Sequence, residues 1–313
     1  MKKFLALTMS LLMVLSLAAC GSQPAADNTD DTNTPDDGTD VVDTIQIPDV
    51  PDFTDIDTSA IPGVEDGVLT VGMECAYAPY NWTQPTDANG AVPIVNNPGN
   101  YANGYDVQMA KRICEAYGWE LEVMAISWEG LTPALNAGTI DAVIAGQSMT
   151  AERLAEVDMA GPYIDASIVC VAKEGSDQAS ATGISNLTGT CTAQTGTIWY
   201  DPCLPQIPGA EIMPEAETAP AMIMAVESGA VDFICTDMPT AMGACAAYDD
   251  MVLLDFSGSG DDFDVSDEEV NIGISVSKGN GDLLDAINAV LEGLTADHFN
   301  ALMDKAIAVQ PEI

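Results

Sequence analysis

The sequence is poor in basic residues, with eight Lys and Arg against 49 Asp and Glu in 313 residues and a formal net charge of −41. Nucleic acids and anionic lipid surfaces attract proteins through clustered cations, so this balance excludes nucleic acid as a partner. The chain has only two arginines, Arg112 and Arg153. Any anion that binds here needs a local site that overcomes the field of the whole chain, and Arg153 is the candidate for its cation.

The sequence has a single histidine and no CxxC pair, which argues against a zinc site. No cofactor motif is present. Seven cysteines follow Cys20, and an odd number rules out complete intramolecular pairing. Several of them lie in apolar strand or helix patterns, where a free thiol behaves as a small hydrophobic residue. Cys191 and Cys203 are the pair to test for a disulfide.

The first 19 residues have the form of a signal peptide. Lys2 and Lys3 precede an apolar run over residues 4–17, which is too short and too early for a membrane span. The run closes on Leu-Ala-Ala-Cys, which resembles the bacterial lipobox, so we expect cleavage after residue 19 and acylation of Cys20. The alternative is an ordinary secretory peptide with a chance cysteine.

Residues 20–62 are expected to form a disordered acidic tether. Positions 21–60 contain 11 Asp and no Lys or Arg. Such a segment buries too little apolar surface to offset the entropy lost on ordering. The roughly 250 residues that remain exceed what one typical domain needs, so two lobes are expected.

The rest of the chain alternates between strand and helix patterns. Strands are predicted at 68–73, 119–125, 140–145 and 167–172, with helices at 104–118 and 129–137. A second series has strands at 190–193, 231–235 and 252–256 with helices at 218–228 and 238–248; a strand at 271–277 and two amphipathic helices follow. This order predicts an α/β fold with parallel sheets, in which a second lobe (174–256) is inserted between two parts of the first (63–173 and 257–313).

The turn Thr150-Ala151-Glu152-Arg153 is the most informative local motif. Thr150 has the features of a helix N-cap, because its hydroxyl can accept from a free amide of the first turn. Arg153 then takes the third helical position, where Glu or Gln is usual and a cation is disfavoured. A guanidinium there makes a compact anion site, suited to a carboxylate or phosphate. The alternatives are a solvated arginine or a salt bridge to Glu152 or Glu156.

Polar groups at four strand ends support a single cleft, because ligands of open α/β sheets bind outside the carboxyl ends of strands. The groups are Glu74 to Tyr77, Gly146 to Arg153, Gly196 with Thr197, and Asp237. They come from both predicted lobes and could converge.

These motifs together resemble a known family. The marks are VGMECAYAPY (71–80), GYDV (104–107), WEGL (128–131), the block 138–153 and GPY (161–163). In order and spacing they are similar to the amino-acid-binding proteins of ABC importers, solute-binding protein family 3, with the type II periplasmic-binding-protein fold. The resemblance runs from about Leu69 to about Val309. It implies a monomer without cofactor that is not an enzyme. Lipidated Cys20 would anchor it to the outer face of the cell membrane, where it passes an amino acid to an ABC permease.

The resemblance also assigns roles in holding the constant part of an amino acid. It implies that Arg153 pairs with the ligand α-carboxylate, with further contacts from Ser148 and the backbone of Gly146. Gly196 and Thr197 resemble the turn of the other lobe that also holds the carboxylate.

Other residues are expected to bind the ammonium group and the side chain of the ligand. The resemblance implies that Asp237 holds the ligand ammonium group; the alternative is a helix cap at Met238-Pro239. It places the rings of Tyr77 and Trp128 around the ligand side chain; the alternative is a core aromatic. Glu74 could meet a polar or cationic side-chain end, which with the acidic surface favours a polar or basic amino acid.

Two other functions remain open from sequence. An enzyme on the same fold, such as a dehydratase resembling cyclohexadienyl dehydratase, would need a general acid, and Glu74 is the one candidate nearby. No nucleophile–base pair or metal set supports catalysis. A sensory amino-acid-binding subunit is the third reading. For a binding protein we expect closure about two crossing segments, near residues 169–173 and 252–257.

Overall fold

The computed structural model describes residues 45–311. The expected signal peptide, the acylation site Cys20 and most of the expected tether lie outside the described residues. Within residues 45–311, every helix falls short of the length and apolar character needed to cross a bilayer.

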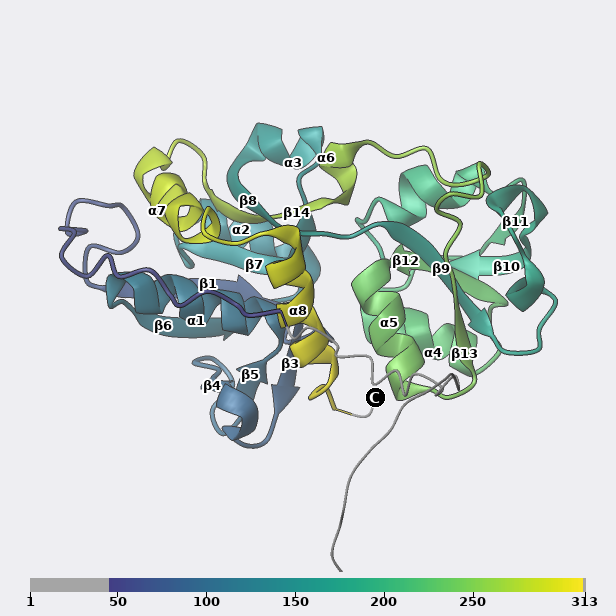
Figure 1. Cartoon of the computed structure of the whole chain (residues 1–313), viewed down its shortest axis with the longest axis horizontal. Helices are drawn as coiled ribbons and strands as arrows, with labels where there is room; N and C mark the ends of the chain where they lie inside the picture. The colour runs from purple at the N-terminus through teal and green to yellow at the C-terminus, as the bar shows by residue number, and fades with distance from the viewer. Residues whose placement is uncertain (1–44, 312–313) are drawn as a thin grey trace, which may run out of the picture. The chain divides into compact units, whose positions relative to one another are not determined.

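Lobe 1 is built on a five-stranded sheet with the order β6-β1-β7-β14-β8 (Figure 1). Its strands are β1 (Val68–Met73), β6 (Glu120–Ala125), β7 (Ala142–Ser148), β8 (Val157–Asp165) and β14 (Asn271–Ser277). β1 runs parallel to β6 and β7, whereas β14 pairs antiparallel with β7 and β8. Its helices are α1 (Tyr105–Tyr117), α2 (Leu131–Asn136), α3 (Ala151–Glu156), α6 (Asp267–Val270), α7 (Gly281–Leu291) and α8 (Ala296–Ile307).

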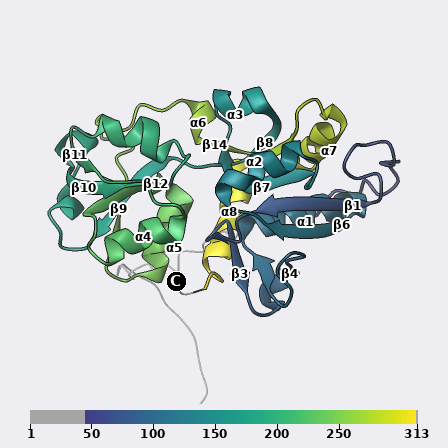
Figure 2. The ribbon, with the colours of Figure 1, turned by 180° about the vertical axis from the view of Figure 1, so that it is seen from behind.

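Lobe 2 has its own five-stranded sheet with the order β11-β10-β12-β9-β13, and Figure 2 shows the two lobes from behind. The strands are β9 (Ile168–Lys173), β10 (Thr188–Thr192), β11 (Gly209–Ile212), β12 (Phe233–Asp237) and β13 (Met251–Leu254), with α4 (Ala219–Glu227) and α5 (Met238–Ala247). The chain leaves lobe 1 after β8 and returns to it at β14. The predicted two-lobed α/β architecture with an inserted second lobe is therefore confirmed.

One boundary differs from the expectation. Residues 168–173 were assigned to lobe 1, but β9 pairs antiparallel with β12 and β13 in the lobe 2 sheet. The chain thus crosses between lobes at residues 166–167 and again over 255–270, after β13. A continuously buried strand has the same sequence pattern in either sheet, so the pattern revealed the strand and not its partners.

Residues 76–103 form a third, four-stranded sheet beside lobe 1, with the order β2-β3-β5-β4. Its strands are β2 (Ala76–Tyr77), β3 (Asn81–Gln84), β4 (Val92–Pro93) and β5 (Tyr101–Asn103). The turn between β2 and β3 is held against the start of α1. Gly104 has φ 124°, and a Cβ there would lie 2.3 Å from the carbonyl oxygen of Tyr80. Only glycine permits that approach, which fixes Tyr77 and Tyr80 relative to lobe 1.

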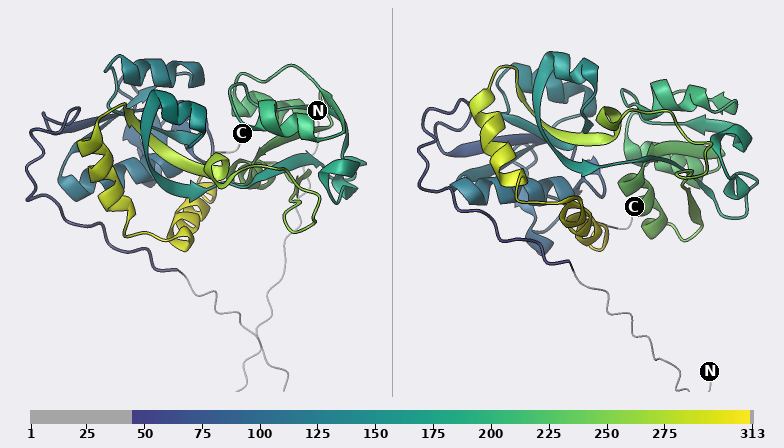
Figure 3. Two further views of the ribbon diagram at one scale, coloured as in Figure 1. Left: turned by 90° about the horizontal axis from the view of Figure 1, so that it is seen from above. Right: turned by 45° about the horizontal axis from the view of Figure 1, so that its top comes forward.

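Residues 45–62 pack along lobe 1 (Figure 3), although their composition predicted a disordered tether. The amide of Phe53 donates to the carbonyl of Ala116 at 2.7 Å, and its ring lies 5.2 Å from that of Tyr117. Trp119 Nε1 donates to Thr58 Oγ1 at 3.1 Å. The packed chain therefore begins further toward the N-terminus than predicted. The average composition concealed a few apolar residues that reach the core: Ile47, Val50, Phe53 and Ile61.

We call residues 45–62 the strap. Shortening the side chain of Phe53 tests whether the strap contributes to stability. We expect Phe53→Ala to lower the free energy of unfolding by about 1–2 kcal/mol, since the ring is half-buried. Ile56→Ala, at a side chain 52 % exposed, is the matched control and should change it by less than about 0.5 kcal/mol. Chemical denaturation of the three proteins measures both. A change below about 0.5 kcal/mol for Phe53→Ala would show that this ring adds nothing to stability.

All seven cysteines of the described residues are free thiols. This includes Cys191 and Cys203, the pair that the sequence singled out, and both are fully buried. Cys203 approaches the thiol of Cys235 on β12 instead. Burial raises the pKa of Cys191 to about 12 and that of Cys235 well above its ordinary value, so these thiols are unreactive.

Candidate functional site

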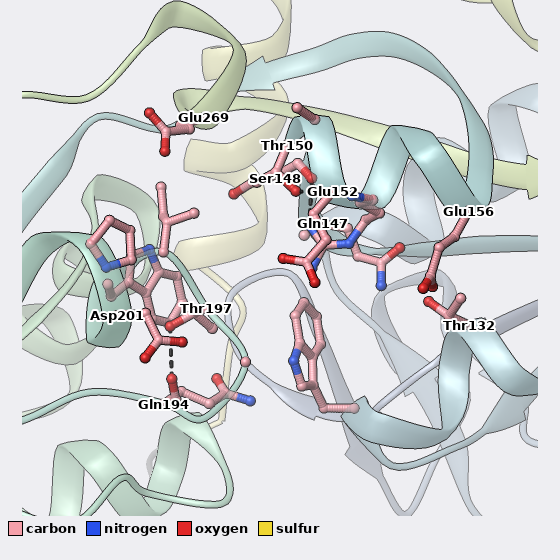
Figure 4. A pocket seen from close by; sticks show the side chains of 18 of the residues that line it. Thr132, Gln147, Ser148, Thr150, Glu152, Glu156, Gln194, Thr197, Asp201 and Glu269 are labelled. Carbon is pink, nitrogen blue, oxygen red and sulfur yellow. Dashed lines mark hydrogen bonds between the residues drawn. The ribbon is translucent and has the colours of Figure 1, made fainter.

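A cavity of about 850 Å³ lies between the lobes and contains most of the predicted site. Seven of the nine predicted ligand-binding residues line it: Tyr77, Trp128, Gly146, Ser148, Arg153, Gly196 and Thr197. Figure 4 shows Ser148 and Thr150 on one side of the cavity and Thr197 and Gln194 on the other. Glu74 and Asp237 do not line the cavity, although both adjoin residues that do.

Arg153 stands at the cavity wall without an acidic partner. Thr150 caps α3, accepting from the Arg153 amide at 3.2 Å, as predicted. The guanidinium donates to the carbonyl of Ser148 and lies 5.5 Å from the centroid of the Trp128 ring. Among residues 45–311 no carboxylate forms an ion pair with it, so the expected alternatives at Glu152 and Glu156 are not seen. Burial lowers its pKa, but a guanidinium stays charged at neutral pH.

Two glycines make room for aromatic rings in the cavity. Gly146 has φ 64°, and a Cβ there would lie 2.6 Å from Cε1 of Tyr77. Gly196 of lobe 2, also at φ 64°, would place a Cβ 3.0 Å from Nε1 of Trp128 in lobe 1. The lobes therefore touch at Gly196. The adjoining turn is fixed by Thr197 Oγ1, which donates to the carbonyl of Gln194 at 2.7 Å.

Asp237 lies one side chain away from the cavity, behind Tyr77. Its Oδ2 accepts from the hydroxyls of Tyr77 at 3.0 Å and Tyr80 at 3.1 Å, both from lobe 1. Its Oδ1 accepts from the Thr240 amide at 2.9 Å, so it also caps α5. The helix cap weighed from the sequence is thus present, and in addition the carboxylate joins the two lobes. At 1 % exposure it is reached from the cavity only past Tyr77.

Two further buried carboxyls accompany Asp237. Burial raises the pKa of Glu74 to about 7, while a donor from Gln194 opposes the rise. Burial likewise raises the pKa of Asp106 to about 7, opposed by hydrogen bonds from Tyr163 and Asn81. Burial also raises the pKa of Asp237. Carboxyls that lose water without gaining a cation favour their neutral form.

These shifts give ligand-free stability a pH dependence. The pKa of Glu74 is raised on folding, so its contribution is fully present below about pH 4.5 and is lost as pH rises through about 7. We expect Glu74→Gln to flatten the fall in unfolding free energy between pH 4.5 and pH 8 by about 3 kcal/mol. The exposed Glu120→Gln serves as control and should keep the wild-type slope. Denaturation at several pH values measures this, and parallel profiles for all three proteins would contradict it.

The cavity is rich in acids that the sequence analysis did not place there. They are Glu129, Glu152, Glu156, Asp201, Glu268 and Glu269, and Arg153 is the one Lys or Arg among the residues that line it. A second negative charge on a ligand would be repelled by this set. Glu152 and Glu156 lie on α3 with Arg153. Asp201, Glu268 and Glu269 come from segments distant in the sequence, so no local pattern predicts the whole set.

Gln194 and Tyr80 are also absent from the predicted site. Gln194 lies two residues beyond the end of β10, and the rule that ligands bind at strand ends could have identified it. Tyr80 lies within the 71–80 motif, but its hydroxyl acts through Asp237, 157 positions away. No local signal predicts that contact.

The sequence signature of the bacterial extracellular solute-binding proteins, family 3, matches residues 69–308, and the chain belongs to this family. The chain is 23 % identical over 233 residues to the L-cystine-binding protein TcyJ of Escherichia coli (strain K12), covering 74 % of this chain and 79 % of that one. It is 23 % identical over 254 residues to the L-arginine-binding protein of Pseudomonas aeruginosa, covering 77 % and 88 %.

Solved structures agree on the fold. An amino acid ABC transporter substrate-binding protein from Streptococcus pneumoniae, bound to L-arginine, superposes with a TM-score of 0.69 at 22 % identity, over 82 % of this chain and 99 % of that one. The ancestral amino acid-binding protein AncCDT-1, a precursor of cyclohexadienyl dehydratase, superposes with a TM-score of 0.61 at 25 % identity, over 78 % and 96 %. The predicted family and type II periplasmic-binding-protein fold are confirmed.

Proposed function

We propose that this protein captures an amino acid outside the cytoplasmic membrane and passes it to the permease of an ABC importer. One observation carries the proposal: Arg153 presents to a cavity between two lobes a guanidinium that has no ion-pair partner among residues 45–311. A guanidinium binds a carboxylate through two parallel hydrogen bonds, which a lysine cannot reproduce. Membership of the family and relatives that bind L-cystine or L-arginine support an amino acid as the ligand.

In this proposal the constant part of the amino acid lies between the lobes. Arg153 and Ser148 hold its carboxylate from lobe 1, with backbone contacts from Gly146, while Gly196 and Thr197 approach it from lobe 2. All five line the cavity. The ligand would then bind the closed arrangement better than an open one, because only closure brings both sides to it.

Asp237 is proposed to serve the ligand ammonium group together with Tyr77. The carboxylate is outside the cavity lining, so either the Tyr77 ring moves or its hydroxyl relays the contact. Tyr77 and Trp128 would flank the ligand body, since both rings line the cavity.

A polar or basic amino acid is the proposed substrate class. The six acids that line the cavity repel an acidic side chain, and Glu74 lies beside Gln194 at its edge. Basic ligands of relatives, such as the L-arginine of the Pseudomonas aeruginosa protein, support this class.

Residues 1–44 lead to two further proposals. The signal peptide is removed after residue 19, and lipidated Cys20 anchors a monomer to the outer face of the cell membrane. Anchoring is supported by the Leu-Ala-Ala-Cys motif and by the family's extracellular location. A lipid-modified N-terminal peptide in mass spectrometry of membrane fractions tests this, and an unmodified one would remove it.

A thermal-shift screen against the twenty amino acids and prephenate tests the function. A ligand that binds only the folded state raises the melting temperature by mass action. At a ligand concentration one hundred times Kd, the folded state is stabilised by about 3 kcal/mol. We expect shifts with a few related polar or basic L-amino acids. A flat screen would overturn the proposed function.

The second candidate is a dehydratase: AncCDT-1 is itself an amino acid-binding protein, but it is a precursor of cyclohexadienyl dehydratase with the same fold. Glu74, with its pKa raised to about 7, could act as a general acid. Its place outside the cavity lining makes this the weaker candidate, and a shift with prephenate alone would reverse the order. A sensory subunit would bind its amino acid through the same contacts as a transport protein. The neighbouring genes distinguish the two roles: permease genes indicate transport, and receptor genes indicate sensing.

A further inference from the structure

Gln194 is almost completely buried at the edge of the cavity, with 1 % of its surface exposed. Its backbone is fixed twice: it bridges to Ala216, and its carbonyl accepts from Thr197 Oγ1. Its side-chain Nε2 nevertheless has no hydrogen-bond partner among the described residues. A buried donor left without a partner costs about 1–3 kcal/mol, so a buried amide on a fixed backbone in this condition points to a group that arrives later.

The Glu74 carboxyl lies beside the Gln194 amide and also has a buried atom without a hydrogen-bond partner among the described residues. The carboxylate comes from lobe 1 and Gln194 from lobe 2, and Oε2 of Glu74 is likewise buried without a partner. The Gln194 amide approaches this carboxyl as a donor without completing a hydrogen bond. When Glu74 is ionised, the approach sets the orientation of the amide, because turning it over would bring its oxygen against the carboxylate. One N–H then faces Glu74 and the second remains for another acceptor.

We propose that Gln194 is a specificity-determining residue that donates from Nε2 to an oxygen at the end of the ligand side chain, with Glu74 as the residue that positions it. The substrate would be an amino acid whose side chain ends in a neutral carboxamide or ureido group. This inference rests on the proposed function and narrows its substrate class.

The other side-chain chemistries fit less well. A guanidinium or an alkylammonium offers only donors, which would face the donor of Gln194. A carboxylate would accept from Gln194, but Glu74 and the six acids of the cavity repel it. Those acids also attract cations at long range, so the discrimination against a basic ligand has to come from the hydrogen bond at Nε2.

L-Citrulline and L-arginine are the most discriminating pair of ligands for a test. Their side chains have the same length and differ at one terminal atom, which is an oxygen in citrulline and a nitrogen in arginine. Isothermal titration calorimetry would measure both, with L-glutamine and L-asparagine alongside. We expect the tightest ligand to be an amide or ureido compound, and L-citrulline to bind roughly tenfold or more tighter than L-arginine. A preference for L-arginine in the wild-type protein would overturn the proposal.

Two variants separate this role from a structural one. Gln194→Leu should lower the affinity for the preferred ligand by roughly tenfold or more and change that for L-arginine by less than about threefold. Glu74→Gln should lower the ratio of the affinity for L-citrulline to the affinity for L-arginine, because the Gln194 amide is then free to turn over. Melting temperatures without ligand show whether each variant folds. An unchanged ratio in both folded variants overturns the inference while amino-acid binding itself stands, whereas no binding of any amino acid by the wild-type protein overturns both.

Discussion

Arg153→Ala is expected to lower amino-acid affinity by about 30- to 3,000-fold while the protein stays folded. Removing one partner of a buried charge pair costs about 2–5 kcal/mol of binding free energy, largely because the other charge is left unpaired. In this cavity the penalty is enlarged, because six acidic side chains line the same cavity as Arg153. The protein without ligand loses little, since within residues 45–311 the guanidinium forms no ion pair; it donates to the Ser148 carbonyl and lies over the Trp128 ring.

Calorimetry of wild-type protein, Arg153→Ala and Arg153→Lys measures this effect. Lysine keeps the charge but loses the paired hydrogen bonds, so it should recover only part of the affinity. Arg112→Ala is the control at the other arginine, which donates to the carbonyl of Asp49 on the strap, far from the cavity lining. Undiminished binding by Arg153→Ala would remove the central element of the proposed function.

The part of the site that the sequence predicted is the part governed by local rules. Thr150 and Arg153 are three positions apart, and the cap that joins them follows from helix geometry. Strand patterns likewise marked β7 and β10, whose ends lead to residues that line the cavity. They also marked β1 and β12, whose ends place Glu74 and Asp237 beside it. The order and spacing of short motifs supplied the family, which no single motif would have done.

What the sequence left undetermined depends on which segments meet. A buried strand such as β9 has one pattern in either sheet, and its partners became known only from the structure. The contact between Tyr80 and Asp237 spans 157 positions, and the approach of Gln194 to Glu74 crosses from one lobe to the other. The strap at residues 45–62 was missed because a few apolar side chains lie within an acidic stretch, and average composition does not weigh single contacts.

Tyr80→Phe is expected to weaken ligand binding by about ten- to hundredfold although Tyr80 does not line the cavity. Its hydroxyl crosses from lobe 1 to Asp237 of lobe 2, and removing one partner of a buried hydrogen bond costs about 1–3 kcal/mol. The rings of Tyr77 and Tyr80 are stacked at 4.7 Å, so Tyr77 retains its place when the hydroxyl is removed. The loss therefore falls on the contact between the lobes.

Tyr105→Phe is the matched control. Tyr105 belongs to the same aromatic group, 6.3 Å from Tyr80, but its hydroxyl donates to the carbonyl of Tyr163 within lobe 1. Both variants lose one buried hydroxyl, so both should lose stability. Only Tyr80→Phe should also lose affinity and show a larger radius of gyration in X-ray scattering without ligand.

The comparison decides how Asp237 contributes. If Tyr80 stabilises the closed arrangement, the apparent Kd rises as the closed fraction falls, and the radius of gyration rises with it. If it only orients Asp237 toward a ligand ammonium group, affinity falls while the radius stays unchanged. Equal affinities for Tyr80→Phe and Tyr105→Phe would show that the contact with Asp237 serves the fold alone. A carboxylate shared between two lobe 1 hydroxyls and a lobe 2 helix cap is best suited to the first outcome, because each of its oxygens is held by a different lobe.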